Sequence, residues 1–132
     1  MILFIDDEKR LMDSYVAELR LCGFDVAFES NVDKALRVLE ERRAEVELLI
    51  LDVMMPSGES FSDQAKQGFR TGVRFYERVR ETQRDLPIIL LTNFPGADII
   101  RVIEGDPHCQ VFQKLELLPY ELADVVTKTL ER

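Results

Sequence analysis

Few cysteines, few basic residues and no long apolar run limit what this chain of 132 residues can be. Its two cysteines, Cys22 and Cys109, are too few and too far apart for a disulfide framework or a zinc site, so we expect both to be reduced and structural. The 17 basic residues are outnumbered by 25 acidic ones, and the net charge of -8 opposes binding to a phosphate backbone. No apolar stretch approaches the ~20 residues that cross a bilayer. We therefore expect no direct nucleic-acid binding and no membrane insertion.

The sequence shows neither a targeting segment nor room for a second domain. It begins Met1-Ile2-Leu3, without a basic start or a cleavage site, which predicts a cytoplasmic protein. A chain of this size buries roughly two thirds of its unfolded surface, enough for one ordinary core over residues 1–132. The single histidine, His108, lies in a predicted turn without partner ligands, so we expect a surface residue there.

Short apolar runs alternate with segments in which apolar residues recur at helical spacing. Strands are predicted to start near Ile2, Phe24, Leu48, Ile88 and Val111. The inward faces of the helices between and after them are predicted from Leu11, Tyr15, Leu19 and Cys22; Val32, Leu36 and Leu39; Val73, Tyr76 and Val79; Ile99, Val102 and Ile103; and Leu122, Val125, Val126 and Leu130. This alternation predicts an α/β fold with a five-stranded parallel sheet covered on both faces.

Local signals mark helix boundaries and one unusually long connection. Gly23 suits a left-handed cap at the end of the first helix, and Ser30 or Asn31 suits the start of the second. The predicted strand starts are separated by 22, 24, 40 and 23 residues, so about sixteen extra residues follow the third strand. Their composition predicts a loop inserted at about residues 56–70.

Polar residues stand where the apolar runs stop. Asp6 and Asp7 follow the first run, Asp52 follows the third, Thr92 the fourth and Lys114 the fifth. The carboxyl ends of parallel strands meet at one edge of the sheet, where ligands of such sheets bind. Singly, the Asp6-Asp7 pair could serve only to cap the first helix. Together, the five side chains predict one site.

Three converging carboxylates favour a hard divalent cation, and a carboxylate beside such a cation can accept a phosphoryl group. Asp52 stands alone after the central strand and is the candidate nucleophile. Asp6 and Asp7 are candidate metal ligands, one directly and one through water. Lys114 is expected to pair with a phosphoryl oxygen, and Thr92 to donate its hydroxyl to another.

These residues carry a family resemblance. The segments IDDE, LILDVMMP and LLT, followed by a lysine after the fifth run, resemble the receiver domain of bacterial two-component response regulators. The resemblance covers nearly the whole chain and includes Pro56, four residues after Asp52. It implies a flavodoxin-like sheet with strand order 2-1-3-4-5. It also implies Mg²⁺ or Mn²⁺ bound by Asp6, Asp7, Asp52 and the backbone carbonyl of Met54.

The resemblance further implies a signalling domain that assists its own phosphorylation and dephosphorylation, and is not an enzyme. A histidine kinase or a phosphotransfer protein would phosphorylate Asp52. The surface formed by the fourth helix, fifth strand and fifth helix would then change and engage an unidentified target protein, and a phosphorylation-linked dimer is left open. Whether the chain acts alone or belongs to a longer protein is open as well.

Several positions depart from the family. Leu115 stands where receivers usually have proline, so Lys114 must be aimed by other contacts, and Val111 stands where many have a switching aromatic residue. Asn93 is larger than the usual Ala or Gly and would narrow access to Asp52. Met54 and Phe94 occupy positions that influence hydrolysis, and neither can orient a water, which predicts a slowly hydrolysing phosphoaspartate.

Alternatives remain for the insertion and for the whole domain. The insertion separates Pro56 from Thr71-Gly72. It is either a loop without a role or a lid or docking element beside the phosphorylation site, with Phe61 and Phe69 as contacts. The domain could be a phosphorylation-independent pseudo-receiver that serves as an interaction module. A phosphohydrolase of the haloacid dehalogenase type would need Asp-x-Asp after the first strand, whereas Asp6 and Asp7 are adjacent. A flavodoxin would need a first loop that binds phosphate, whereas the acids Asp6-Asp7-Glu8 would repel it.

Overall fold

The computed structural model describes residues 1–54, 71–93, 96–114 and 116–131. The predicted insertion at 56–70, with Phe61 and Phe69, lies outside these ranges, as do Phe94 and Leu115. The strands are β1 (Ile2–Ile5), β2 (Val26–Glu29), β3 (Leu48–Leu51), β4 (Ile88–Thr92) and β5 (Cys109–Gln113). The helices are α1 (Lys9–Leu21), α2 (Val32–Glu41), the 3-10 helix η1 (Arg43–Glu45), α3 (Thr71–Thr82), α4 (Ala97–Ile103) and α5 (Pro119–Leu130). In the described part of the chain, no helix has the length and apolar character needed to cross a membrane.

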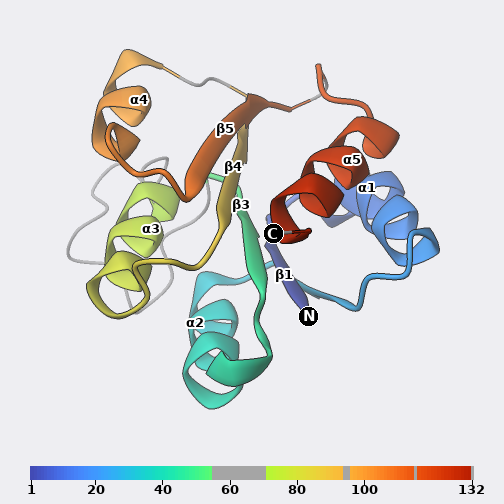
Figure 1. Ribbon diagram of the computed structural model, residues 1–132, viewed down its shortest axis with the longest axis horizontal. Helices are drawn as coiled ribbons and strands as arrows, with labels where there is room; N and C mark the ends of the chain where they lie inside the picture. Colours follow the sequence, from blue (N-terminus) through green and yellow to red (C-terminus); the bar gives the residue numbers. More distant parts are fainter. Residues whose placement is uncertain (55–70, 94–95, 115, 132) are drawn as a thin grey trace.

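The five strands form one parallel sheet in the order β2-β1-β3-β4-β5, which confirms the predicted fold class and strand order. The helices form a layer on each face of the sheet, with α1 and α5 side by side on one face and α2, α3 and α4 on the other (Figure 1). The central strands β1, β3 and β4 are buried along their whole length, as their uninterrupted apolar sequences predict.

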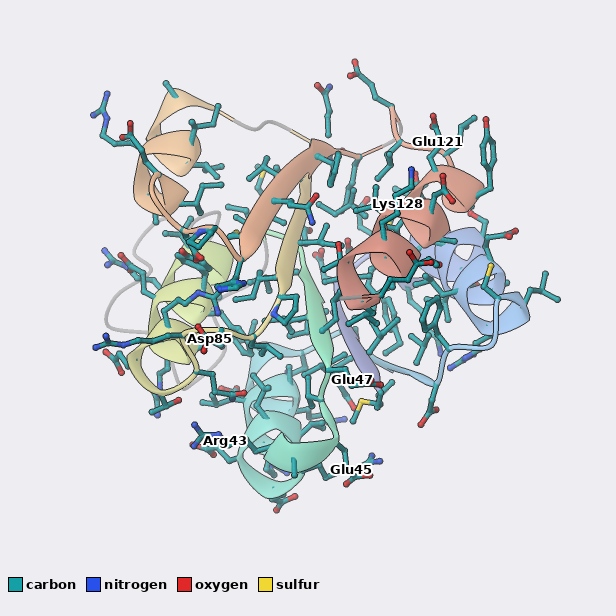
Figure 2. All side chains as sticks on the ribbon, in the orientation of Figure 1. Arg43, Glu45, Glu47, Asp85, Glu121 and Lys128 are labelled. Carbon is teal, nitrogen blue, oxygen red and sulfur yellow. The ribbon has the colours of Figure 1, made fainter. Side chains whose placement is uncertain are left out.

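Two hydrophobic cores lie on the two faces of the sheet because successive strand residues point to opposite sides. The core beneath α2, α3 and α4 takes Leu3, Ile5, Leu49, Leu51, Ile88 and Leu90 from the strands. The core beneath α1 and α5 takes Ile2, Phe4, Leu48, Ile50, Ile89 and Leu91. Figure 2 shows side chains of the sheet and of both helix layers filling the space between them.

The ends of α1 and α2 follow the predicted capping residues. Gly23 has a φ of 95°, its N–H donates to the carbonyl of Arg20, and the N–H of Phe24 donates to the carbonyl of Leu19. This pair of bonds is a Schellman motif, for which glycine is best suited. Of the two cap candidates for α2, Asn31 is the cap, because its side chain accepts from the N–H groups of Asp33 and Lys34.

Some details of the sequence prediction were wrong. Leu11 and Cys22 are exposed, and Met12, Tyr15, Val16 and Leu19 form the buried face of α1. On α4, Val102 is exposed and only Ile99 is fully buried. The strands β2 and β5 begin two residues away from the predicted starts, at Val26 and Cys109. Both cysteines are free, and burial raises the pKa of the Cys109 thiol to about 12.

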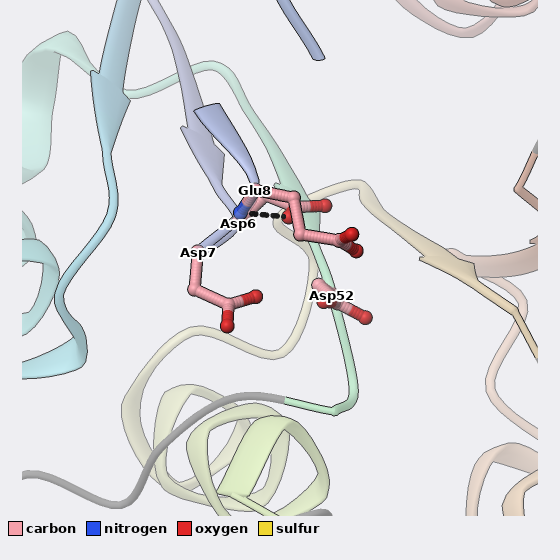
Figure 3. A group of neighbouring side chains, drawn as sticks. All are labelled: Asp6, Asp7, Glu8 and Asp52. Carbon is pink, nitrogen blue, oxygen red and sulfur yellow. Dashed lines mark hydrogen bonds between the residues drawn. The ribbon is translucent and has the colours of Figure 1, made fainter. Parts of the chain in front are cut away.

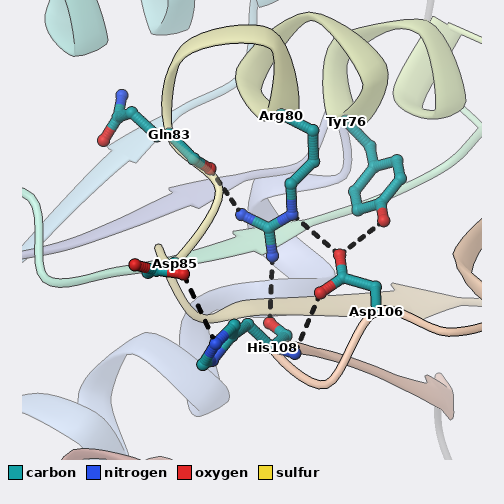
Figure 4. Close-up of polar contacts among 6 residues, drawn as sticks. All are labelled: Tyr76, Arg80, Gln83, Asp85, Asp106 and His108. Atoms are coloured by element: carbon teal, nitrogen blue, oxygen red, sulfur yellow. Dashed lines mark hydrogen bonds and ion pairs between the residues drawn. The ribbon is translucent and has the colours of Figure 1, made fainter.

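A polar cluster ties α3 to the turn before β5, at the end of β5 remote from Lys114 (Figure 4). Asp106 accepts hydrogen bonds from the Tyr76 hydroxyl at 2.5 Å and from Arg80 Nε at 2.7 Å. Arg80 also donates to the backbone carbonyls of Gln83 and His108. Burial alone would raise the pKa of Asp106, but the hydrogen bonds that it accepts outweigh burial and lower it. The His108 side chain is partly exposed and lies 3.6 Å from Asp85.

Candidate functional site

The backbone of the sheet places Asp6 and Asp52 side by side. They follow β1 and β3 directly, and these neighbouring strands pair Ile5 with Leu51. Hydrogen bonds extend the sheet by one residue on each strand, from Asp52 N to the carbonyl of Ile5 at 2.9 Å and from Asp6 N to that of Glu29 at 3.1 Å. Both carboxylates are buried, with 0% and 3% of the residue exposed for Asp6 and Asp52.

Thr92 and Lys114 reach the same edge from the other half of the sheet. Thr92 is the last residue of β4, and Lys114 follows β5 directly. The N–H of Lys114 donates to the carbonyl of Thr92 at 2.8 Å, so both backbones are fixed relative to each other. Both residues are buried. The structure therefore brings the side chains of Asp6, Asp52 and Lys114 into contact and places Thr92 at the same edge of the sheet, as the strand ends predicted.

Two more acids complete a cluster at this edge. Carboxylate oxygens of Asp6, Asp7, Glu8 and Asp52 all lie within 4.8 Å of one another (Figure 3). Asp7 and Glu8 are exposed, whereas Asp6 and Asp52 are buried. The N–H of Glu8 donates to Asp6 Oδ1 at 2.8 Å, which holds the short segment between β1 and α1 in place. Glu8 is absent from the residues predicted from sequence, although it is the third consecutive acid after the strand.

The Lys114 ammonium lies among three of these carboxylates. Its Nζ is 2.9 Å from Asp6 Oδ2, 2.9 Å from Glu8 Oε1 and 3.1 Å from Asp52 Oδ2. Burial alone would lower the pKa of Lys114, but its bonds to Asp6 and Glu8 and the charge of Asp52 raise it above its ordinary value. The lysine therefore carries a positive charge at neutral pH despite its burial.

A single ammonium does not balance four carboxylates. Burial and the neighbouring charge of Asp6 raise the pKa of Asp52 from 3.8 to about 6, although Lys114 and the Met54 N–H oppose the rise. Burial likewise raises the pKa of Asp6. The surplus of negative charge destabilises the folded state, and a bound cation would reduce the repulsion among the carboxylates.

The donor set fits a hard divalent cation. Mg²⁺ and Mn²⁺ prefer oxygen ligands, and the cluster offers carboxylate oxygens from two adjacent loops. A second observation concerns Thr92, whose Oγ1 is buried and has no hydrogen-bond partner among the described residues. Buried hydroxyl groups normally have partners. The hydroxyl is thus available for an oxygen that arrives with a ligand.

Gly72 fixes the distance between α3 and the loop after β3. Its N–H donates to the carbonyl of Val53 at 2.9 Å. A Cβ at this position would lie 2.3 Å from the Asp52 carbonyl oxygen and 2.4 Å from the Cα of Val53. Only glycine allows this close approach, because any side chain would push α3 away from the backbone of Asp52.

The other predicted positions surround this site. The N–H of Met54 donates to Asp52 Oδ1 at 3.1 Å, and its side chain is 39% exposed. Asn93 is partly buried directly after β4, and Phe94 lies outside the described residues. Val111 packs on the core beneath α2, α3 and α4, whereas Phe112 packs on the opposite core. The strand β5 thus carries a valine where many receivers have a switching aromatic residue.

Comparison with known proteins identifies the class that this fold and site define. Residues 2–131 match the family model of the response regulator receiver domain, so the chain belongs to that family. Receiver domains are the signal-accepting modules of two-component systems.

Individual relatives agree with this assignment. The chain is 30% identical over 102 residues to the transcriptional regulatory protein CpxR of Klebsiella pneumoniae, and 29% identical over 102 residues to that of Escherichia coli. These matches cover 77% of this chain but 37% of each relative, so the chain spans just over a third of their length. A CheY-like receiver domain from Methanospirillum hungatei has the same fold, with a TM-score of 0.79, 18% identity, and coverage of 98% of this chain and 92% of that one.

Proposed function

We propose that this domain accepts a phosphoryl group on Asp52 from a histidine kinase or a phosphotransfer protein, in a reaction that requires Mg²⁺ or Mn²⁺. The position of Asp52 carries the proposal. Its carboxylate is buried at the end of the central strand β3, 3.1 Å from Lys114 Nζ, and lies within the same cluster as Asp6 and Asp7. Such a carboxylate can act as a nucleophile toward phosphorus.

The transfer exchanges one bond for another. A carboxylate oxygen of Asp52 forms a bond to phosphorus while the bond from phosphorus to the donor histidine nitrogen breaks, and that nitrogen keeps the electron pair. Lys114 then pairs with a phosphoryl oxygen, and the Thr92 hydroxyl donates to another. The distance of 3.1 Å between Lys114 Nζ and Asp52 Oδ2 supports the first of these contacts. The unpartnered Thr92 hydroxyl is available for the second contact.

The metal would be held by Asp6, Asp7, Asp52 and the backbone carbonyl of Met54. When bound, the ion supplies charge neutralisation for the transferred oxygens. The protein's own contribution is the fixed placement of the acids, since the backbones of Asp6 and Asp52 are held by extensions of the sheet.

Phosphorylation is proposed to alter the surface formed by α4, β5 and α5. The phosphoryl group would bind Thr92 at the end of β4 and Lys114 at the end of β5, so its charge acts directly on the strand ends beside that surface. On α4, Ile100 and Val102 are 54% and 36% exposed. These apolar side chains could contact a protein target or a second copy of the domain once the surface has changed.

The phosphoaspartate is proposed to hydrolyse slowly. In-line attack on phosphorus needs a water held by a polar side chain, and Met54, close to Asp52, cannot hold one. Following the loss of phosphate from purified phosphoprotein would test this. A lifetime of seconds would contradict it, and Met54→Asn should shorten the lifetime if the apolar side chain is responsible.

Mass spectrometry tests the proposed function directly. The protein is incubated with acetyl phosphate and Mg²⁺, and we expect the mass of one added phosphoryl group in the wild type and none in Asp52→Asn. Asp13→Asn, an exposed acid on α1, is the matched control and should be phosphorylated like the wild type. Absence of the added mass from the wild type, with acetyl phosphate and with a histidine kinase, would favour the pseudo-receiver that binds partners without phosphorylation.

A further inference from the structure

The segment that joins β5 to α5 carries Lys114 and needs anchoring. It begins at Lys114, whose N–H is bound to the carbonyl of Thr92, and ends at Leu118, whose N–H donates to Glu121 Oε1 at 2.8 Å. The residue after Lys114 is leucine, so no proline ring fixes the backbone at that point. A third anchor lies between these two, and it comes from α1.

Tyr15 supplies that anchor. Its hydroxyl donates to the carbonyl of Leu117 at 2.5 Å, a contact between residues 102 positions apart in the sequence. Tyr15 is 4% exposed and packs in the core beneath α1 and α5, and Leu117 packs against the same core. The bond thus ties the middle of α1 to the segment three residues after Lys114.

The hydroxyl of Tyr15 is not needed to fill the core. The other members of that core include Met12, Val16, Leu19 and Leu122, which are apolar and suit a phenylalanine ring as well as a tyrosine ring. A buried hydroxyl is disfavoured unless it forms a hydrogen bond, so its value lies in the bond to Leu117. That bond restricts where the segment after Lys114 can go.

We propose that Tyr15 is a positioning residue for Lys114, holding the segment after β5 so that the ammonium faces Asp52. The proposal rests on the proposed function, because it gives Lys114 its role toward the phosphoryl group. Tyr15 itself does not touch that group. It acts through the carbonyl of Leu117, three residues after the lysine.

Tyr15→Phe tests the proposal because it removes only the hydroxyl. Tyr76→Phe is the matched control: it also removes a hydroxyl that donates at 2.5 Å, but to Asp106 at the far end of β5. With acetyl phosphate and Mg²⁺, we expect Tyr15→Phe to lower the phosphorylation rate roughly tenfold, the change in rate that corresponds to the free energy of one hydrogen bond. Tyr76→Phe should react at the wild-type rate. A reduction of equal size in both variants would overturn the proposal in favour of a general loss of stability.

A second measurement does not depend on phosphorylation. Lys114 is one of five lysines, and its buried, ion-paired ammonium should give a ¹⁵N signal separate from those of exposed lysines. We expect that signal to shift or broaden in Tyr15→Phe and to stay in place in Tyr76→Phe, with both variants folded by circular dichroism. An unchanged signal in Tyr15→Phe would refute the positioning role. A wild type that shows the Lys114 signal but takes up no phosphoryl group would instead count against the proposed function.

Discussion

Replacing Asp52 by asparagine is expected to stabilise the unphosphorylated, metal-free protein at neutral pH. Burial and the charge of Asp6 raise the pKa of Asp52 from 3.8 to about 6. Each pKa unit corresponds to about 1.4 kcal/mol, so ionising this carboxyl costs the folded state on the order of 3 kcal/mol. Asparagine has nearly the same shape and no charge. We therefore expect the free energy of unfolding to rise by about 2 to 3 kcal/mol.

The loss of the contact with Lys114 works in the opposite direction but is the smaller effect. Breaking a buried ion pair is strongly destabilising when it leaves a charge without a partner. In Asp52→Asn, Lys114 Nζ still has Asp6 and Glu8, each at 2.9 Å. The repulsion among the acids therefore outweighs the lost contact, and we expect the free energy of unfolding to rise in Asp52→Asn.

The pH dependence provides the sharper test. Because the folded pKa of Asp52 lies above its unfolded value, the neutral carboxyl contributes stability that is fully present below 3.8 and is lost as the pH rises through about 6. The gain from Asp52→Asn should be near zero below about pH 4, grow up to about pH 6 and then level off. Urea unfolding of both proteins across this range, in the presence of a metal chelator, measures the gain.

Two results would refute this reasoning. One is an Asp52→Asn variant less stable than the wild type at neutral pH, and the other is a gain that does not vary with pH. Asp7→Asn is the control, because it removes an exposed acid from the same cluster and should change the unfolding free energy far less. Mg²⁺ at about 1,000 times Kd should then reverse the order of stability, since binding stabilises the wild type by about 4.1 kcal/mol and the variant lacks a ligand.

Three further predictions follow from the same site. Gly72→Ala should lower the free energy of unfolding, measured in urea, by about 2 kcal/mol, because its Cβ would lie 2.3 Å from the Asp52 carbonyl oxygen. An unchanged urea midpoint would contradict this. Gly96→Ala is the control, because its Cβ would meet only the Asp98 side chain. Glu8→Gln should raise the rate of phosphorylation by acetyl phosphate about threefold, because it removes a half-exposed carboxylate that competes for Lys114. Asp13→Asn is the control and should leave the rate unchanged. A slower Glu8→Gln variant would show that the acid assists the reaction. At Mg²⁺ concentrations well below Kd, the same rate should fall as the pH drops below about 6, because protonated Asp52 in the metal-free protein neither holds the ion nor attacks phosphorus. A flat profile down to about pH 4 would argue against Asp52 as the acceptor.

Much of the fold and the centre of the site could be predicted because both depend on local patterns. Uninterrupted apolar runs such as Leu48–Leu51 predict buried parallel strands, and a polar residue directly after such a run must lie at the edge of the sheet. The side chains of Asp52 and Thr92 were located in this way. The strand order that makes their strands neighbours came from the family resemblance and not from a local pattern.

The errors arose where a local pattern allowed two outcomes. Leu11 and Met12 are adjacent and both apolar, so helical spacing alone did not decide which of them faces the core. The edge strand β5 alternates partly buried and exposed residues, as at Cys109 and Gln110, which obscured its first residue.

Contacts between distant segments were beyond any sequence pattern. The ion pair of Glu8 with Lys114 joins residues 106 positions apart, and no spacing rule links them. The hydrogen bond from Tyr15 to Leu117 is of the same kind. Such contacts depend on the packing of α1 against α5, which becomes known only when the whole chain is folded.

The polar cluster around Asp106 bears on how a signal can travel through β5. Arg80 and Tyr76 clamp the turn where this strand begins, whereas its other end, at Lys114, is held by charges that a phosphoryl group would rearrange. The two ends of β5 are therefore held by different means, by hydrogen bonds to Asp106 at one end and by the ion pairs of Lys114 at the other. On the proposed function, a phosphoryl group on Asp52 changes the partners of Lys114 and leaves those of Asp106 in place, so we expect the change that a partner protein senses to be largest close to Lys114.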